Sequence, residues 1–176
     1  ESSIPIHFVI AGTGQEKEQL QLLTHRLKIS DRVTFTDFVP DEDVANLYAL
    51  ANTFIIASTA ELQSIVTLQA LASGLPVIGA DSFALPDLVH DQENGYLFDP
   101  NNPDQIAQQI TNLFSNPKLQ RKMSDKSLEI IQPHNINHVI EQYNEMYRYA
   151  TEHHTPIEKT SRFERVTQTV SRLNPL

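Results

Sequence analysis

The chain has 176 residues, the size of one domain and enough to bury about two-thirds of its unfolded surface. Its formal net charge of −9 argues against a general nucleic-acid-binding protein. The absence of cysteine excludes disulfides and thiol chemistry, and no apolar run has the length of a membrane span. The first residues lack the pattern of a signal peptide. We therefore expect a cytoplasmic protein without a nucleic-acid partner, and leave peripheral membrane association open.

Short apolar runs alternate with segments of helical periodicity along the chain. Strands are predicted at residues 6–11, 32–36, 53–57, 76–80 and 96–99. Helices are predicted at residues 16–28, 41–51, 64–73, 103–115, 118–131 and 135–151, with a short one starting at Pro86. Strands that alternate with helices indicate an α/β fold with a Rossmann-like parallel sheet flanked by helices. We expect one such domain over residues 1–150 and a helical tail over residues 151–176.

The first strand is followed by Gly12-Thr13-Gly14. These two glycines suggest a dinucleotide-binding turn, but Lys17 stands where the third glycine of that fingerprint would be. A simple strand-to-helix turn is therefore the favoured interpretation. After the second strand, Phe38 and Val39 form a loop that either lies against a nucleotide base or packs Phe38 on the core.

Residues 53–80 carry the strongest local pattern. A buried strand is followed by the isolated acid Glu61, and a helix begins near Ser64. Gly74 is predicted to end that helix in the left-handed conformation, and Pro76 prevents it from resuming. A strand–helix–strand unit of this kind is right-handed and parallel, so the helix N-terminus lies at the carboxyl edge of the sheet. The free N–H groups there favour an anion such as phosphate.

The basic residues are unevenly distributed. Between Val33 and Pro117 there is no Lys or Arg, while the same interval contains eleven acids. The upstream cations are interpreted as solvated helix and turn residues: Lys17, Arg26, Lys28 and Arg32. The histidines show no spacing typical of a metal site, so we expect no metal and no cofactor.

Several fragments of the sequence, taken in order, resemble a known family. They are Val9-Ile10-Ala11-Gly12-Thr13-Gly14, Arg32-Val33-Thr34-Phe35, Leu47-Tyr48, Ala57-Ser58, Ala70-Leu71-Ala72-Ser73-Gly74-Leu75-Pro76-Val77 and Asn94-Gly95-Tyr96-Leu97-Phe98. The chain resembles, from about Ile6 to Tyr147, the C-terminal, donor-binding half of retaining glycosyltransferases with the GT-B fold, of the family 4 or group 1 type. Their common order and spacing make the resemblance specific.

The resemblance implies roles for particular residues. Glu61 would bind hydroxyls of the donor sugar, and is the candidate catalytic residue; the alternative is an acid that complements the helix dipole. The backbone N–H groups of Ser64 and Ile65 would bind the diphosphate, and the Ser64 hydroxyl could add a donor. Gln69 stands where the family has a second acid that binds the ribose, so we expect weaker or altered ribose recognition, or else a neutral helix residue.

Four further residues complete the candidate donor-binding set: Phe38, Val39, Gly12 and Gly14. The family also uses an Arg and a Lys from a preceding strand that this sequence does not contain, and needs no metal when they are present. That strand would lie between those at residues 6–11 and 53–57, so its absence would leave both with open edges. The resemblance further implies an N-terminal acceptor domain as a partner, absent from this chain.

The sequence therefore predicts the donor-binding domain of a retaining hexosyltransferase that uses a nucleoside-diphosphate sugar such as UDP-glucose or GDP-mannose. The isolated chain is expected to be inactive, and a lipid acceptor is a weak preference. Two alternatives stay open. One is a non-catalytic nucleotide-sugar-binding or regulatory module, favoured by Gln69 and the missing cations. The other is an epimerase-like enzyme of related architecture.

Overall fold

The computed structural model describes residues 4–154. Contacts divide the chain into two units, Glu1–Pro133 and His134–Leu176. The first contains the strands and six of the α-helices described, and the second contains α7 (Ile136–Glu152). The predicted tail from residue 155 onward lies outside the described residues, and the functional division after residue 150 stays a prediction.

The order of elements in the first unit follows the predicted alternation. It runs β1 (Phe8–Ala11), α1 (Lys17–Arg26), η1 (Ser30–Arg32), β2 (Val33–Asp37), α2 (Asp41–Leu50), β3 (Phe54–Ile56), α3 (Ile65–Ala72), β4 (Val77–Ala80), α4 (Leu85–Leu88), β5 (Gly95–Phe98), α5 (Pro103–Phe114) and α6 (Pro117–Ile130), and the 3-10 turn η2 (Gln132–His134) follows. The predicted bounds are correct to within two residues. Elements so short are identifiable because glycine and proline mark their ends.

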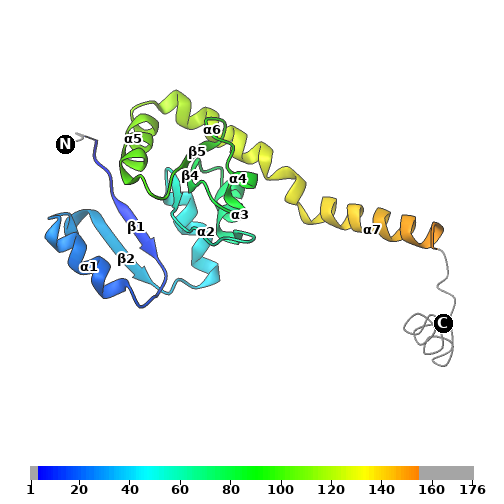
Figure 1. Ribbon diagram of the computed structural model, residues 1–176, viewed down its shortest axis with the longest axis horizontal. Coiled ribbons are helices and arrows are strands. Elements are labelled where there is room, and N and C mark those ends of the chain that lie inside the picture. Colours follow the sequence, from blue (N-terminus) through cyan, green and yellow to red (C-terminus); the bar gives the residue numbers. More distant parts are fainter. Residues whose placement is uncertain (1–3, 155–176) are drawn as a thin grey trace, which may run out of the picture. The chain divides into compact units, whose positions relative to one another are not determined.

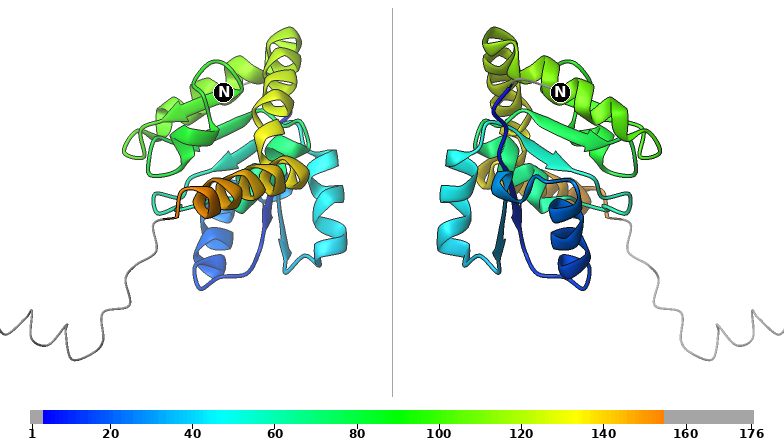
Figure 2. Two further views of the ribbon diagram at one scale, coloured as in Figure 1. Left: turned by 90° about the vertical axis from the view of Figure 1, so that its right-hand side faces the viewer. Right: turned by 90° about the vertical axis from the view of Figure 1, so that its left-hand side faces the viewer.

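The strands form two separate parallel sheets (Figures 1 and 2). In one, β1 pairs only with β2; in the other, β4 lies between β3 and β5. Within residues 4–154, therefore, β1 and β3 each have one edge without a strand partner. Phe8, Val9 and Ile10 of β1 are exposed although they are apolar, whereas every residue of β4 is buried.

The core lies on both faces of the three-stranded sheet. Its fully buried large apolar side chains come from β4 and from four helices or their ends: Leu71, Val77, Ile78, Leu85, Val89, Leu113 and Met123. A buried strand on which helices pack from two faces is typical of parallel sheets. The hydroxyl of Ser127 in α6 donates to the carbonyl of Leu75, 2.8 Å away, and so ties this helix to the start of β4.

The end of α3 confirms the predicted cap. Gly74 has a φ of +70°, and the N–H of Leu75 donates to the carbonyl of Ala70 at 3.0 Å. Glycine adopts this left-handed conformation without the steric penalty that a Cβ would bring. The turn directs the chain from α3 into β4 within three residues.

The start of β5 is fixed by a buried asparagine. The side chain of Asn94 accepts from the N–H of His90 at 2.7 Å and donates to the carbonyl of Leu88 at 3.0 Å. Both bonds are inside the protein, since Asn94 is fully buried. At the next residue β5 approaches β4 so closely that a Cβ on Gly95 would lie 1.7 Å from the carbonyl oxygen of Val77.

In the second unit, α7 begins at Asn135, whose side chain accepts from the N–H of Asn137. Its apolar residues are exposed: Ile136, Ile140, Tyr143, Met146, Tyr147 and Tyr149. None of the helices within residues 4–154 combines the length and the apolar character needed to cross a membrane.

We predict that Gly95→Ala lowers the free energy of unfolding by about 3 kcal/mol, because a methyl group at this position forces β4 and β5 apart. Urea denaturation of the variant and the wild-type chain would measure this. Gly14→Ala is the matched control: nothing lies within 4 Å of a Cβ there, so its stability should stay near that of the wild type. An unchanged midpoint for Gly95→Ala would contradict the close approach of the two strands.

Candidate functional site

The candidate site is built from the loops that follow β3 and β4. The N–H of Ala84 donates to the backbone carbonyl of Glu61 at 3.1 Å. The hydroxyl of Ser82 donates to the carbonyl of Thr59 at 3.3 Å. Because parallel strands end at the same edge of a sheet, these two loops meet, and the two hydrogen bonds join them into one surface in front of α3.

Glu61 is held in this surface by its backbone, which leaves its side chain available. The residue is partly exposed, and among the residues that the structure describes its carboxylate has no hydrogen bond or ion pair. A carboxylate in this position can accept hydrogen bonds from hydroxyl groups of a ligand. The geometry therefore agrees with the predicted role without testing it.

The N-terminus of α3 presents free donors. Within the described part of the chain, the backbone N–H groups of Ser64 and Ile65 donate to no protein acceptor. Unpaired N–H groups at a helix start attract an anion. The side chain of Ser64 does not join them: it is buried, and its hydroxyl is hydrogen-bonded to that of Thr67 at 2.8 Å. The interpretation that this hydroxyl faces the ligand is not supported by its position.

Gln69 lies on the exposed side of α3, one turn after Ile65. Its carbonyl Oε1 accepts from the hydroxyl of Tyr48 in α2, 3.3 Å away, and the same hydroxyl is 3.1 Å from the carbonyl of Val66. Partial burial raises the pKa of Tyr48, so its hydroxyl keeps its proton. Gln69 is thus tied to a neighbouring helix and is not simply a solvated helix residue.

The other predicted residues lie at the end of the β1–β2 sheet. Gly12 has a φ of +119° and its N–H donates to the carbonyl of Asp37 at 2.9 Å, while Gly14 accepts from the N–H of Lys17. This is the strand-to-helix turn that the sequence favoured. Phe38 is 74% exposed, so the interpretation that it packs on the core is wrong; Val39 is half-buried.

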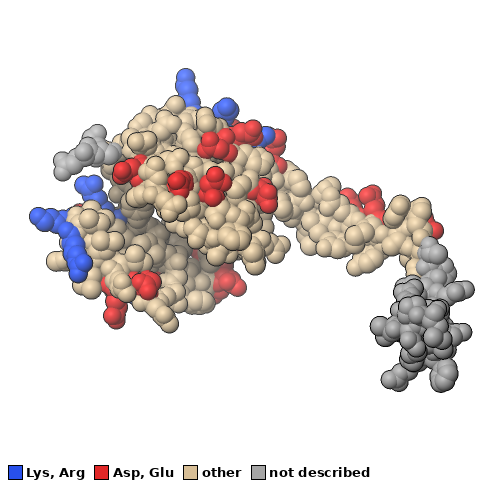
Figure 3. Space-filling view, in the orientation of Figure 1, with Lys and Arg blue, Asp and Glu red and all other residues tan. Residues whose placement is uncertain are grey.

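Lys17, interpreted from the sequence as a solvated helix residue, is partly exposed and also has a specific partner. Its ammonium group forms an ion pair with the carboxylate of Asp37, across 20 positions of sequence. On the face shown in Figure 3, basic side chains gather over α1 and α6, and acidic ones are spread over much of the first unit. Sequence alone could not pair Lys17 with Asp37, because the contact depends on the pairing of β1 with β2.

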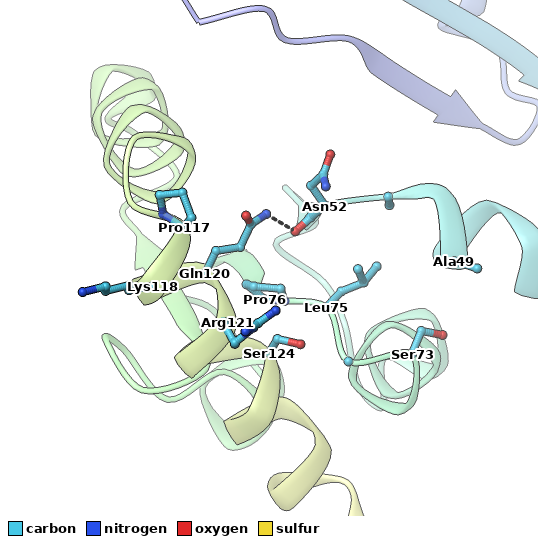
Figure 4. Close-up of a pocket in the computed structure, with 12 residues that line it drawn as sticks. Ala49, Asn52, Ser73, Leu75, Pro76, Pro117, Lys118, Gln120, Arg121 and Ser124 are labelled. Atoms are coloured by element: carbon cyan, nitrogen blue, oxygen red, sulfur yellow. Dashed lines mark hydrogen bonds between the residues drawn. The ribbon is translucent and has the colours of Figure 1, made fainter.

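A groove of about 620 Å³ lies at the opposite edge of the larger sheet, where β3 and β4 begin (Figure 4). It is lined by residues before β3, by the end of α3 and by α6, including Asn52, Gly74 and Arg121. The side-chain amide of Gln120 donates to the carbonyl of Asn52 across it at 3.0 Å. Lys118 and Arg121 of α6 also line this groove, and none of the predicted donor-binding residues does.

Three contributors to the site escaped the sequence analysis. Tyr48 gave no signal beyond the fragment Leu47-Tyr48 of the family resemblance, and Thr67 gave none at all. The bond from the hydroxyl of Ser82 to Thr59 could not be predicted either. Each acts through a contact between segments that are distant in sequence or between side chains whose orientation depends on burial.

The parallel strands, the flanking helices and the free helix N-terminus at their carboxyl edge define one half of a GT-B glycosyltransferase fold. The chain belongs to the family described as glycosyl transferases group 1, whose sequence profile matches residues 1–129. An uncharacterized glycosyltransferase of Haemophilus influenzae is 33% identical over 136 residues, which cover 76% of this chain and 38% of that protein.

Solved structures confirm the fold. Sucrose-phosphate synthase from Thermosynechococcus elongatus aligns with a TM-score of 0.73 and 25% identity, over 82% of this chain and 38% of that one. Anabaena Alr3699/HepE in complex with UDP aligns with a TM-score of 0.73 and 22% identity, over 82% and 41% of the two chains. The chain thus spans about 38% of the length of the Haemophilus relative and of the synthase.

We predict that Ser64→Ala lowers the free energy of unfolding by about 1–2 kcal/mol, because it leaves the buried hydroxyl of Thr67 without its partner. The double variant Ser64→Ala, Thr67→Val removes both hydroxyls and should be more stable than Ser64→Ala. Chemical denaturation of the two variants measures the difference. Full stability of Ser64→Ala would show that the two hydroxyls are not paired inside the protein.

Proposed function

We propose that this chain is the donor-binding part of an enzyme that transfers a hexose from a nucleoside-diphosphate sugar to an acceptor hydroxyl, with retention of the anomeric configuration. The observation that carries the proposal is that, within residues 4–154, neither the carboxylate of Glu61 nor the nearby N–H groups of Ser64 and Ile65 have a protein partner. A sugar supplies hydroxyl protons for the carboxylate, and a diphosphate supplies oxygens for the N–H groups.

The proposal assigns separate tasks to the two groups. The N-terminus of α3 stabilises the diphosphate, which becomes the leaving group when the glycosidic bond to phosphate breaks. Glu61 orients the sugar so that the acceptor hydroxyl reaches the anomeric carbon from the face that the diphosphate leaves. A solved structure of this fold contains UDP, which makes a uridine donor the first ligand to test. The lipid acceptor stays a prediction.

We further propose that a parallel strand outside this chain lies between β1 and β3. Both edges are without a strand partner in residues 4–154, and the start of β1 is close to the other sheet because Ile6 packs against the core. One inserted strand would give the order β2-β1-inserted-β3-β4-β5 and cover the exposed Val9 and Ile10. Exposed strand edges are unfavourable in soluble proteins. This strand would also bring the Arg and Lys expected for the diphosphate.

The inserted strand predicts a change in hydrogen exchange at one residue. The N–H of Phe54 donates to Pro76 and so points toward β4. Because alternate residues of a parallel strand point to opposite edges, the N–H of Ile55 points to the open edge. We expect Ile55 to exchange fast in the 176-residue chain and at least about 100-fold slower in a longer protein that includes the preceding segment. Phe54 is the control, protected in both; equal exchange of Ile55 in the two proteins would contradict the proposal.

The non-catalytic alternative has one specific observation in its favour. No Lys or Arg occurs between Val33 and Pro117, and the one cation near the β1 turn, Lys17, is already paired with Asp37. A module that binds a nucleotide sugar without cleaving it would need less stabilisation of the leaving phosphate. Detection of sugar transfer by the longer protein would exclude this alternative.

We predict that Glu61→Gln weakens binding of the donor sugar nucleotide by at least about tenfold, since hydrogen bonds to a charged acceptor contribute about 1.5–3 kcal/mol. Calorimetric titration with UDP-glucose and GDP-mannose measures this in the longer protein. Affinity for UDP alone, which lacks the sugar, should change less than about twofold.

The matched control for this titration is Glu145→Gln in α7, which makes the same chemical change at an exposed position in the other unit. It should bind the donor as the wild type does. Equal affinity of the wild type and Glu61→Gln for the sugar nucleotide would remove Glu61 from the site. Absence of binding to both donors by the wild type would reject the proposed function itself.

A further inference from the structure

The groove at the start of β3 and β4 lies at the other end of α3 from the candidate donor site. The N-terminus of α3 opens toward that site, whereas Ser73 and Gly74, which follow the helix, line the groove. Its volume of about 620 Å³ is within the range of about 300–1,000 Å³ that is typical of small-molecule sites. A ligand in the groove would therefore be separate from a ligand at the donor site.

Hydrogen bonds between distant segments hold the walls of the groove in place. The bond from Gln120 to the carbonyl of Asn52 joins α6 to the segment before β3, across 68 positions of sequence. The bond from Ser127 to the carbonyl of Leu75 joins the same helix to the start of β4, across 52 positions. A groove held in this way is formed before a ligand arrives, which reduces the entropy lost on binding.

The end of α3 directs few free acceptors at the groove. Carbonyl groups at a helix C-terminus carry a partial negative charge and disfavour anions when they are unpaired. Here the carbonyls of Gln69, Ala70 and Leu71 accept from N–H groups of the turn that follows the helix. The turn thus removes much of the usual obstacle to an anion at this end of a helix.

Positive charge enters the groove from α6. Lys118 and Arg121 line it, and none of the lining residues is acidic. Within residues 4–154 neither cation forms an ion pair, whereas Lys126 of the same helix is paired with Glu93 and Glu129. In Figure 4 the side chain of Arg121 is directed into the groove and that of Lys118 away from it. The guanidinium charge in the groove is therefore uncompensated, in a chain with a net charge of −9.

A hydroxyl lies beside the guanidinium group. Ser124 is three positions after Arg121, so both are on one face of α6. The Ser124 hydroxyl makes no hydrogen bond in the part of the chain that the structure describes, and a Cβ on Gly74 would lie 3.4 Å from its oxygen. A guanidinium group presents its donors as a fork that matches two oxygens of one anion. Together the two side chains suit a ligand group that has several oxygens and a negative charge.

We propose that this groove binds the phosphate group of a phosphomonoester. Arg121 binds two phosphate oxygens, Ser124 donates to a third, and Lys118 adds its charge at the rim. A phosphomonoester carries about −1.5 to −2 charges at neutral pH, which matches two cations better than the single charge of a carboxylate does. The site goes beyond the proposed function, because none of the predicted donor-binding residues belongs to it.

The site is tested by nuclear magnetic resonance titration of the longer protein, which includes the preceding segment, with glycerol 3-phosphate. The backbone N–H signals of Gly74 and Ser124 should shift and saturate with a Kd of about 1 mM. Arg121→Gln should weaken this binding by at least about tenfold, because it removes the bidentate partner. Absence of saturable shifts at these two residues in the wild type would overturn the proposal.

Lys126→Gln is the matched control, since it removes one positive charge from the same helix outside the groove. It should leave the affinity for glycerol 3-phosphate within about twofold of the wild type. Equal weakening by Lys126→Gln and Arg121→Gln would show an effect of net charge alone and would overturn the site. Shifts confined to Ser64 and Ile65 would place the phosphate at the donor site instead, and would also overturn it.

Two further ligands test the chemical class and its source. Acetate at equal ionic strength should bind at least about fivefold more weakly than glycerol 3-phosphate, and equal affinity would overturn the choice of phosphate over carboxylate. Vesicles that contain phosphatidic acid present the same phosphomonoester on a lipid. Sedimentation with these vesicles that is lost in Arg121→Gln would support the site with a lipid as the source, and binding of glycerol 3-phosphate alone would support it with a soluble ligand.

Discussion

The structure of the candidate site depends on the burial of β4 between β3 and β5. All four residues of β4 are buried, both of its edges are paired, and Gly95 lets β5 approach the backbone of Val77. A strand confined in this way cannot shift its register without moving the core. The carboxyl ends of β3 and β4 are consequently fixed relative to each other, and the loops that follow them meet at Glu61 and Ala84.

Polar groups around α3 fall into two sets with different tasks. The hydroxyls of Ser64 and Tyr48 and the carbonyl of Gln69 bond to other protein groups and hold the local structure. The Glu61 carboxylate and the first N–H groups of α3 are left without protein partners among the described residues. A negative acceptor beside several neutral donors suits a ligand that carries both hydroxyl groups and phosphate oxygens. Polar groups of one short segment therefore have different tasks: the paired ones hold the local structure, and those without a protein partner are available to a ligand.

The proposed strand between β1 and β3 explains in physical terms why the strands form two separate sheets. Apolar residues of β1 are exposed, and the open edges of β1 and β3 lack ladder partners within residues 4–154. Both conditions are costly for a soluble protein, and one parallel strand between the sheets would relieve both. The same strand would supply charge to a region whose sequence between Val33 and Pro117 has no basic residue. Stability and phosphate binding would then depend on a single segment.

The sequence by itself determined the order, type and approximate bounds of the elements. These depend on local features: short apolar runs, helical spacing, and markers such as Gly74 and Pro76, which act on their own stretch of backbone. Glu61 stood out locally as an isolated acid between a buried strand and a helix start, but its role in sugar binding came from the family resemblance and stays a prediction. The resemblance of the ordered motifs to group 1 glycosyltransferases, now confirmed by the family match, needed nothing more than the printed chain.

Only the tertiary structure decided where individual side chains point. The inward hydroxyl of Ser64 and the exposed ring of Phe38 each differ from an interpretation that the sequence allowed. The pair of Lys17 with Asp37 could not be predicted from the sequence. Tyr48 reaches Gln69 across 21 positions of sequence. Such orientations follow from contacts between segments that meet only in the folded chain, and a local pattern contains no information about which acceptor or cavity a side chain will find there.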